Sequence, residues 1–242
     1  MKKATLLIRD IEKIYTMQMK QKKDIIYSHA SIVFHHDEII YVGNDDVSCF
    51  MDKDTRVVDG TGQIAFPGFI ECDKSFVFQC FDEERRIREN LYLASQKGVL
   101  TYGCQNCPSF LQDIYWEIAL MREKSFPVCR VKELLASNKK WKRKYFCISS
   151  SSASIKGEDL LLMAKILYMH SQIDEITLLK SITLYPSRRL LNKKIGTLKK
   201  GMQADVLLIH ACDIKEVFST IEETKFSHVI KKGVHIFPKI VV

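Results

Sequence analysis

The spacing of hydrophobic and polar positions changes twice along the 242-residue chain. Near the N-terminus, short β-rich runs separated by polar or glycine-containing turns predict an antiparallel meander, with strands over residues 31–35, 39–42, 56–59 and 63–66. The same kind of run returns close to the C-terminus. It predicts strands over residues 204–210, 227–231 and 234–237, with Lys232-Gly233 as a hairpin turn.

Between these two ends, short apolar runs alternate with longer stretches of helical period. Strands are predicted over residues 68–72, 99–103, 128–131 and 145–149, and helices over residues 82–97, from Ser109 to Met121, and over 158–170. Such alternation is typical of a parallel sheet joined by right-handed crossovers. The chain is therefore predicted to be an α/β protein in which a β module made from both ends flanks inserted β/α units.

Several segments resemble the metal-dependent amidohydrolase superfamily, and within it imidazolonepropionase. The most specific, Ile195-Gly196-Thr197-Leu198-Lys199-Lys200-Gly201-Met202-Gln203-Ala204-Asp205-Val206, is similar to that family's closing Gly-Ser-Leu-x-x-Gly-Lys-x-Ala-Asp-Leu segment. Pro67-Gly68-Phe69-Ile70-Glu71 resembles the turn and first strand of its barrel, and Ile14-Tyr15-Thr16 lies in a stretch similar to its opening strands.

This resemblance implies two domains. Residues 1–66 and 196–242 are expected to form a composite β-sandwich, and residues 67–195 a partial (β/α) TIM barrel. A complete barrel takes about 250 residues, and the segment available here has roughly half that length. The barrel is therefore predicted to be a truncated remnant, and a homodimer is one expected way to cover its exposed sheet edges.

Amidohydrolase chemistry needs a divalent metal, and so needs several nitrogen or carboxylate ligands that converge at the strand ends. In the resembling family, His-x-His on the first strand supplies two ligands, and here Asp73 and Ser75 stand in those places. The family's last-strand aspartate is replaced by serine, near Ser150 or Ser151, and no histidine occurs between Pro67 and Met169. We therefore expect vestigial metal positions at Asp73, Ser75 and Ser151, no zinc or iron cofactor, and a catalytically degenerate protein.

Two other functions stay open. One is an active hydrolase of cyclic C–N bonds with an unusual metal site built from Cys72, Asp73, Cys104 and Cys107. The other is a basic interaction module, because the net charge is +8 and residues 139–144 place Trp141 inside a run of lysine and arginine. Lysines elsewhere alternate with acids, so nucleic-acid binding is not expected.

The lengths of the apolar runs predict the cellular compartment. The run Ala4 to Ile8 is too short for a signal-peptide core, and no later run approaches the roughly 20 residues that cross a bilayer. We expect a soluble, cytoplasmic protein that does not enter a membrane. Its eight cysteines are accordingly expected to be reduced.

Overall fold

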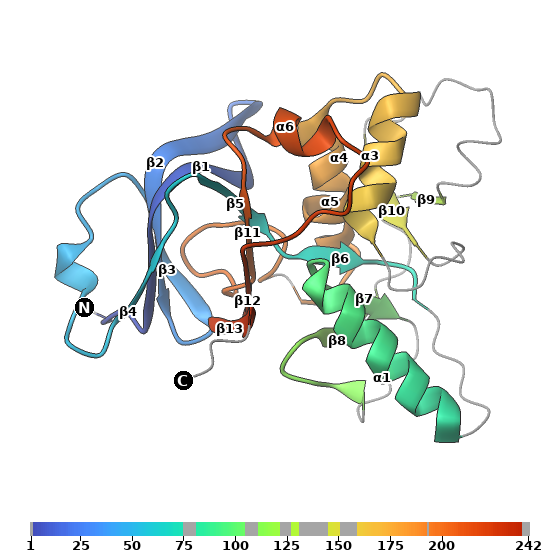
Figure 1. Cartoon of the computed structure of the whole chain (residues 1–242), viewed down its shortest axis with the longest axis horizontal. Helices are drawn as coiled ribbons and strands as arrows, with labels where there is room; N and C mark the ends of the chain where they lie inside the picture. The colour runs from blue at the N-terminus through green and yellow to red at the C-terminus, as the bar shows by residue number, and fades with distance from the viewer. Residues whose placement is uncertain are drawn as a thin grey trace. The chain divides into compact units, whose positions relative to one another are not determined.

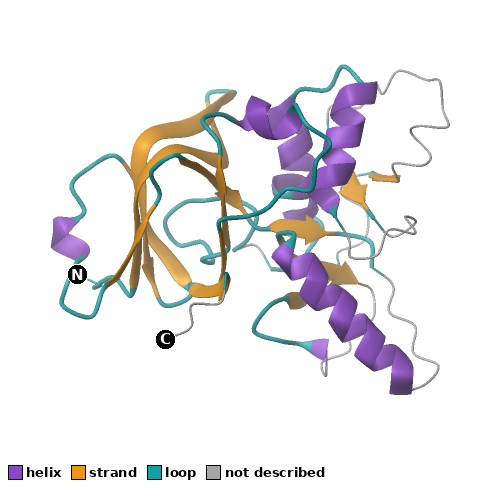
Figure 2. Ribbon diagram, viewed as in Figure 1, coloured by secondary structure: helices purple, strands orange, loops and turns teal. Residues whose placement is uncertain are grey.

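The computed structural model describes residues 2–74, 81–104, 111–121, 127–130, 145–150, 159–192 and 194–238. The chain divides into two compact units, which are considered separately below. Unit 1 comprises Met1–Gly68, Thr197–Val217 and Phe226–Val242, and unit 2 comprises Phe69–Gly196 and Phe218–Lys225. Figures 1 and 2 show their strands and helices. None of the helices in the described ranges is both long enough and apolar enough to cross a membrane.

Unit 1 is built on an eight-stranded sheet to which both ends of the chain contribute. The strand order is β13-β12-β11-β5-β1-β2-β3, and β4 pairs with β1 off this path. The strands are β1 (Leu6–Lys20), β2 (Lys23–His35), β3 (Glu38–Gly43), β4 (Arg56–Asp59), β5 (Gln63–Pro67), β11 (Val206–His210), β12 (His228–Lys231) and β13 (Val234–Phe237). A short 3-10 helix, η1 (Ser48–Phe50), lies between β3 and β4. The antiparallel pairing of β11 with β5 joins the C-terminal strands to the N-terminal ones.

Strand β1 is long because it bends. Its pairing with β2 has two register shifts, and Asp10 and Met17, both with φ of 59°, lie within them. Bulges of this kind bend a strand and increase its twist. Near its start β1 therefore pairs with β4, and further along it pairs with β5, both in parallel. The predicted antiparallel meander is wrong at these two strands, because each returns beside β1 in the same direction.

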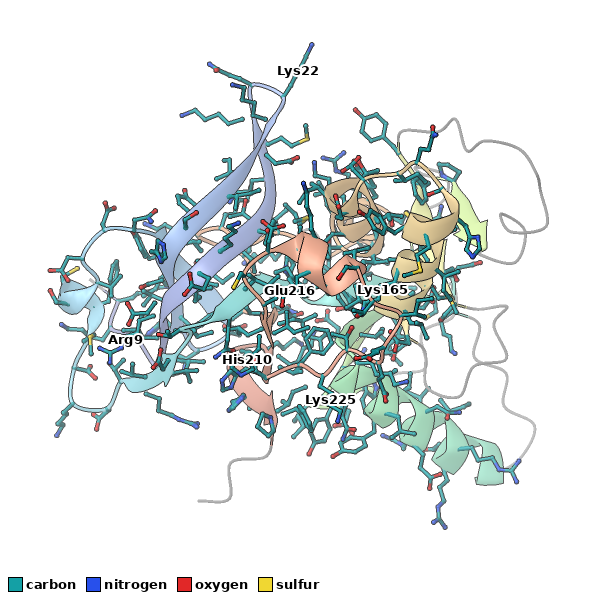
Figure 3. All side chains as sticks on the ribbon, turned by 45° about the horizontal axis from the view of Figure 1, so that its top comes forward. Arg9, Lys22, Lys165, His210, Glu216 and Lys225 are labelled. Carbon is teal, nitrogen blue, oxygen red and sulfur yellow. The ribbon has the colours of Figure 1, made fainter. Side chains whose placement is uncertain are left out.

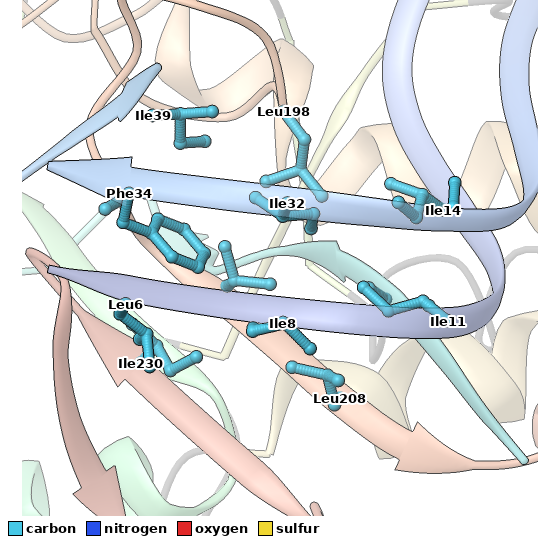
Figure 4. Close-up of a cluster of buried hydrophobic side chains, with 14 of the residues drawn as sticks. Leu6, Ile8, Ile11, Ile14, Ile32, Phe34, Ile39, Leu198, Leu208 and Ile230 are labelled. Atoms are coloured by element: carbon cyan, nitrogen blue, oxygen red, sulfur yellow. The ribbon is translucent and has the colours of Figure 1, made fainter. Parts of the chain in front are cut away.

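The inward faces of these strands enclose one hydrophobic core. Ile8, Phe34 and Ile230, from β1, β2 and β12, are fully buried in it; Figure 4 shows them with their neighbours. The outer edge of β3 is covered, since the Ile39 N–H donates to the Met202 carbonyl at 2.8 Å just before β11 begins. The sheet therefore folds over its own core, as predicted for a composite β-sandwich.

Unit 2 contains two short parallel sheets with helices beside them. The sheet orders are β6-β7-β8 and β10-β9, and all three pairings are parallel. The strands are β6 (Phe69–Glu71), β7 (Val99–Cys104), β8 (Glu117–Leu120), β9 (Val128–Arg130) and β10 (Cys147–Ser149). The helices are α1 (Phe81–Gln96), α3 (Leu160–His170), α4 (Glu175–Ile182) and α5 (Leu184–Ser187), while α6 (Ile214–Phe218) ends where the chain passes between the units. The predicted α/β class, with a β-sandwich and a truncated barrel, is confirmed.

The helix predicted from Ser109 to Met121 is wrong in its described part. Residues Glu117–Leu120 form β8 and pair in parallel with β7. The side chain of Gln112 donates to the Ile118 carbonyl at 2.7 Å and accepts from the Ile118 N–H at 3.1 Å. These side-chain bonds satisfy backbone groups that a helix would have paired internally. Ile114, which the helical period places on an apolar face, is 67% exposed.

Candidate functional site

The carboxyl ends of β6 and β10 in unit 2 are joined by a buried carboxylate. Glu71, the last residue of β6, is fully buried. Its Oε2 accepts from the backbone N–H of Ser150 at 2.7 Å and from the Ser150 hydroxyl at 2.6 Å. Its Oε1 accepts from the backbone N–H of Asp73 at 3.1 Å. Hydrogen bonds to a carboxylate are stronger than hydrogen bonds between neutral groups, so Glu71 links the end of β6 in one sheet firmly to the end of β10 in the other.

A pair of buried thiols lies on the same two strand ends. Cys72 follows β6, Cys147 begins β10, and both are free and fully buried. The side-chain hydrogen bond with Cys147 and burial hold the pKa of the Cys72 thiol well above its ordinary value, while the charge of Arg189 acts in the opposite direction. Cys72 is therefore a neutral thiol at pH 7. A neutral thiol is a poor nucleophile and a poor metal ligand.

Two further ionisable side chains feel the charge of Glu71. Burial, and then the Glu71 carboxylate, raise the pKa of Tyr102 on β7 well above its ordinary value. Burial lowers the pKa of Lys74, and Glu71 opposes that shift. The Tyr102 hydroxyl is buried and has no hydrogen-bond partner among the described residues. The site thus combines a buried carboxylate with a neutral phenol and a neutral thiol.

The side chains of this site do not fit the coordination of a catalytic zinc ion. Both oxygens of Glu71 already accept hydrogen bonds, and one of these bonds comes from the Ser150 hydroxyl. Catalytic zinc requires about three protein ligands with lone pairs free to point at one centre. Across the ranges that the structure describes, no group of three histidine, cysteine, aspartate or glutamate side chains is placed to hold a metal ion.

The residues predicted for a metal site are only partly within the described structure. Asp73 is half-buried just after β6, and Cys72 and Cys104 are buried at the ends of β6 and β7. Ser75, Cys107 and Ser151 lie outside the described residues, as does the basic run at residues 139–144. The vestigial site and the alternative cysteine site therefore both stay predictions.

Sequence reasoning did not find the carboxylate link. Glu71 sits at a strand end, where an acid usually meets water. Its partner Ser150 is 79 residues away in the chain. The sequence indicates Tyr102 only weakly, because its hydroxyl is a polar group inside the mostly apolar run of β7.

Comparisons with known proteins were made on both sequence and structure. No protein-family model matches the chain, and no curated protein matches its sequence. Solved structures do match it. Ochratoxinase from A. niger is 10% identical, with 96% of each chain covered and a TM-score of 0.65. Atrazine chlorohydrolase from Arthrobacter aurescens TC1, complexed with zinc, is 11% identical, with 95% of this chain and 94% of that one covered and a TM-score of 0.63.

A prolidase complexed with N-methylphosphonate-L-proline is 8% identical, with 96% of this chain and 99% of that one covered and a TM-score of 0.60. The chain shares the fold of these three proteins. At 8–11% identity this likeness establishes the architecture alone, because function depends on the residues of the site. The finer resemblance to imidazolonepropionase stays a prediction.

Unit 1 holds a second group of titratable side chains, on β12 and β13. His228 Nδ1 lies 2.9 Å from His235 Nε2. Burial lowers the pKa of His235 to about 4, with smaller contributions from the charges of His228 and Arg56. A backbone hydrogen bond with Phe237 acts in the other direction and raises the pKa. Burial, followed by the charge of His210, lowers the pKa of His228. Both rings are therefore neutral at pH 7.

This pair predicts a loss of stability in acid. Well above pH 6.5, the ordinary histidine pKa, both folded and unfolded states are neutral and the pair contributes no pH dependence. As the pH falls from 6.5 toward about 4, the unfolded state takes up protons that the folded state refuses, so the free energy of unfolding decreases. Urea unfolding of the wild type and of His228→Gln/His235→Gln measures this. The double variant should show a shallower decrease, and parallel pH profiles would contradict the assignment.

Proposed function

We propose that this protein is a catalytically degenerate relative of imidazolonepropionase-like amidohydrolases that does not carry out metal-dependent hydrolysis. The proposal is carried by the hydrogen bonds from Ser150 to the Glu71 carboxylate. They join the two strand ends next to which the resembling family holds its metal ligands.

Geometry supports this assignment at both strand ends. Asp73, a vestigial metal position, lies two residues after Glu71, and Ser151, another, comes immediately after Ser150. The contacts of 2.6 and 2.7 Å commit the lone pairs of Oε2 to the two donors of Ser150, just after β10, and bring the strand ends close together. A metal ion would need those ends to present unengaged donors to a common centre. The hydrogen bonds between Glu71 and Ser150 would then have a structural role, which is to hold the two strand ends together.

The alternative hydrolase with ligands Cys72, Asp73, Cys104 and Cys107 has less support. Zinc or iron would have to displace the proton of the Cys72 thiol, and that costs more here because the hydrogen bond to Cys147 and burial raise the pKa of Cys72. Ionising that thiol would also place a second negative charge close to Glu71. We therefore favour the degenerate relative over this enzyme.

The experiment is a ring-opening assay with imidazolonepropionate, the substrate that the resemblance indicates. Purified protein is assayed after incubation with Zn²⁺, with Fe²⁺ and with a chelator, beside a genuine imidazolonepropionase as the positive control. We expect no turnover above the uncatalysed rate under any of the three conditions. Turnover that the chelator abolishes, and that Asp73→Ala also abolishes, would overturn the proposal.

A further inference from the structure

Three histidines form a diagonal row on one face of the C-terminal strands of unit 1. His228 lies two residues before Ile230 on β12, and Ile230 is directly opposite His235 on β13. On the other side, Leu208 of β11 is opposite His228, and His210 lies two residues further along. Residues two apart on a strand share a face, and diagonal neighbours are within reach of long side chains. The strand register therefore places all three rings on the same face.

Two of these rings are in direct contact. The ring centroids of His228 and His235 are 4.9 Å apart with a tilt of 41°, and the facing nitrogens Nδ1 and Nε2 are 2.9 Å apart. Both side chains are half-buried. His210, labelled in Figure 3, is exposed and close enough for its charge to act on His228. The hairpin thus holds two imidazole nitrogens at a fixed short distance, with solvent within reach.

Such a pair has the chemistry of a metal ligand set. Neutral imidazole is the form that binds Zn²⁺, Cu²⁺ and Ni²⁺, and burial keeps both rings neutral at pH 7, so protons do not compete. Nitrogens bonded at about 2.0–2.1 Å and at right angles around one ion are roughly 2.9 Å apart. The observed separation equals that value, and it is now the length of a hydrogen bond between the two rings, which the metal ion would replace. Both ligands are imidazole nitrogens, which disfavours Mg²⁺ and Ca²⁺ because those ions need oxygen ligands. The positive charge of Arg56 acts on His235 and opposes any cation, so the bonds to the two nitrogens have to outweigh it.

We propose that His228 and His235 form a two-histidine site for a borderline transition-metal ion, with water completing its coordination. Each ring would present the nitrogen that now faces the other ring. One of these two nitrogens carries the proton of the hydrogen bond between the rings, and on metal binding that proton would move to the remote nitrogen of its own ring. No proton is released, because both rings start neutral. Two protein ligands hold a metal less tightly than a catalytic zinc site does, so this ion exchanges with solution. The site lies in unit 1 and does not depend on the function proposed for unit 2.

The test uses the full chain without an affinity tag, titrated with Cu²⁺ and with Ni²⁺ at pH 7.5 in a calorimeter. We expect one ion per chain and tighter binding of Cu²⁺ than of Ni²⁺. His228→Gln and His235→Gln should each weaken binding by about tenfold or more, as loss of one of two ligands requires. The control His170→Gln removes an exposed histidine of α3 and should leave affinity unchanged, as should Asp73→Ala.

A second measurement does not depend on the folding of the variants. Electron paramagnetic resonance of the wild type with one equivalent of Cu²⁺ should show coupling to the nitrogens of two imidazoles. A spectrum without imidazole coupling would overturn the proposal. So would equal affinity in the wild type and in both glutamine variants.

Discussion

Replacing Asp205 by alanine is expected to lower the free energy of unfolding of unit 1 by about 3–5 kcal/mol, the usual effect of breaking a buried ion pair. Asp205 Oδ2 accepts from Lys231 Nζ at 2.7 Å and from Gln203 Nε2 at 2.8 Å, and its Oδ1 accepts from the Lys232 N–H at 2.9 Å. The side chains of Lys231 and Asp205 are only 1% and 6% exposed. The substitution leaves an ammonium group in the core without a counter-charge.

Urea unfolding followed by circular dichroism measures this loss, since both tryptophans, Trp116 and Trp141, belong to unit 2 and do not report on unit 1. The matched control is Asp213→Ala, which removes an ion pair of similar length, 2.6 Å to Lys13, whose side chains are more than a third exposed. That pair is screened by water and contributes about 0–1 kcal/mol. In Asp205→Asn/Lys231→Met, where both charges are gone, much of the lost stability should return. Equal effects of Asp205→Ala and Asp213→Ala would contradict the buried role of Asp205.

Glu71→Ala is expected to destabilise unit 2 by about 3 kcal/mol or more, because it leaves several donors without an acceptor at roughly 1–3 kcal/mol for each buried group. The donors are the N–H and hydroxyl of Ser150 and the N–H of Asp73. Glu71→Gln keeps the shape and one acceptor oxygen but turns an amide NH₂ toward other donors. The loss of stability in Glu71→Gln should therefore be smaller than in Glu71→Ala but still measurable.

Hydrogen exchange at the Ser150 amide reports this link locally. In the wild type that amide should be protected, and in Glu71→Ala it should exchange faster, whereas β1 and β2 of unit 1 should be unaffected. Glu89→Ala is the control, since Glu89 is an exposed acid of α1 that accepts from Arg85 at 3.0 Å. Wild-type protection of Ser150 in Glu71→Ala would show that the carboxylate does not hold the strand ends together.

Local signals in the sequence predicted the turns that depend on glycine. Gly233, with φ of 73°, closes the β12–β13 hairpin as expected. Gly196, with φ of 83°, turns where a Cβ atom would lie 2.7 Å from the Thr183 carbonyl, so no larger residue fits. The turn between β1 and β2 was missed. It is made by Gln21 and Lys22, which carry no turn signal yet have φ of 50° and 66°. Pairing of the long flanking strands imposes that conformation.

The buried polar groups could not be predicted from local patterns. Glu71 and Asp205 are satisfied by residues far away in the sequence, so a local pattern shows an acid at a strand end and not its burial. Neither the buried ion pair of Asp205 with Lys231 nor the hydrogen bond that Asp205 accepts from the Lys232 N–H could be read from the sequence around Asp205. The contact of His228 with His235 is different, because the predicted hairpin register would have placed the two rings on one face.

The metal content of unit 2 tests most directly the proposed loss of hydrolase function. The His228→Gln/His235→Gln variant is used so that the hairpin histidines bind nothing. It is expressed with added zinc and iron, purified without chelators, passed through gel filtration and analysed by mass spectrometry. We predict far less than one equivalent of either metal, and no change on adding Asp73→Ala. About one equivalent of zinc or iron, lost with Asp73→Ala and accompanied by chelator-sensitive ring opening, would contradict the proposal.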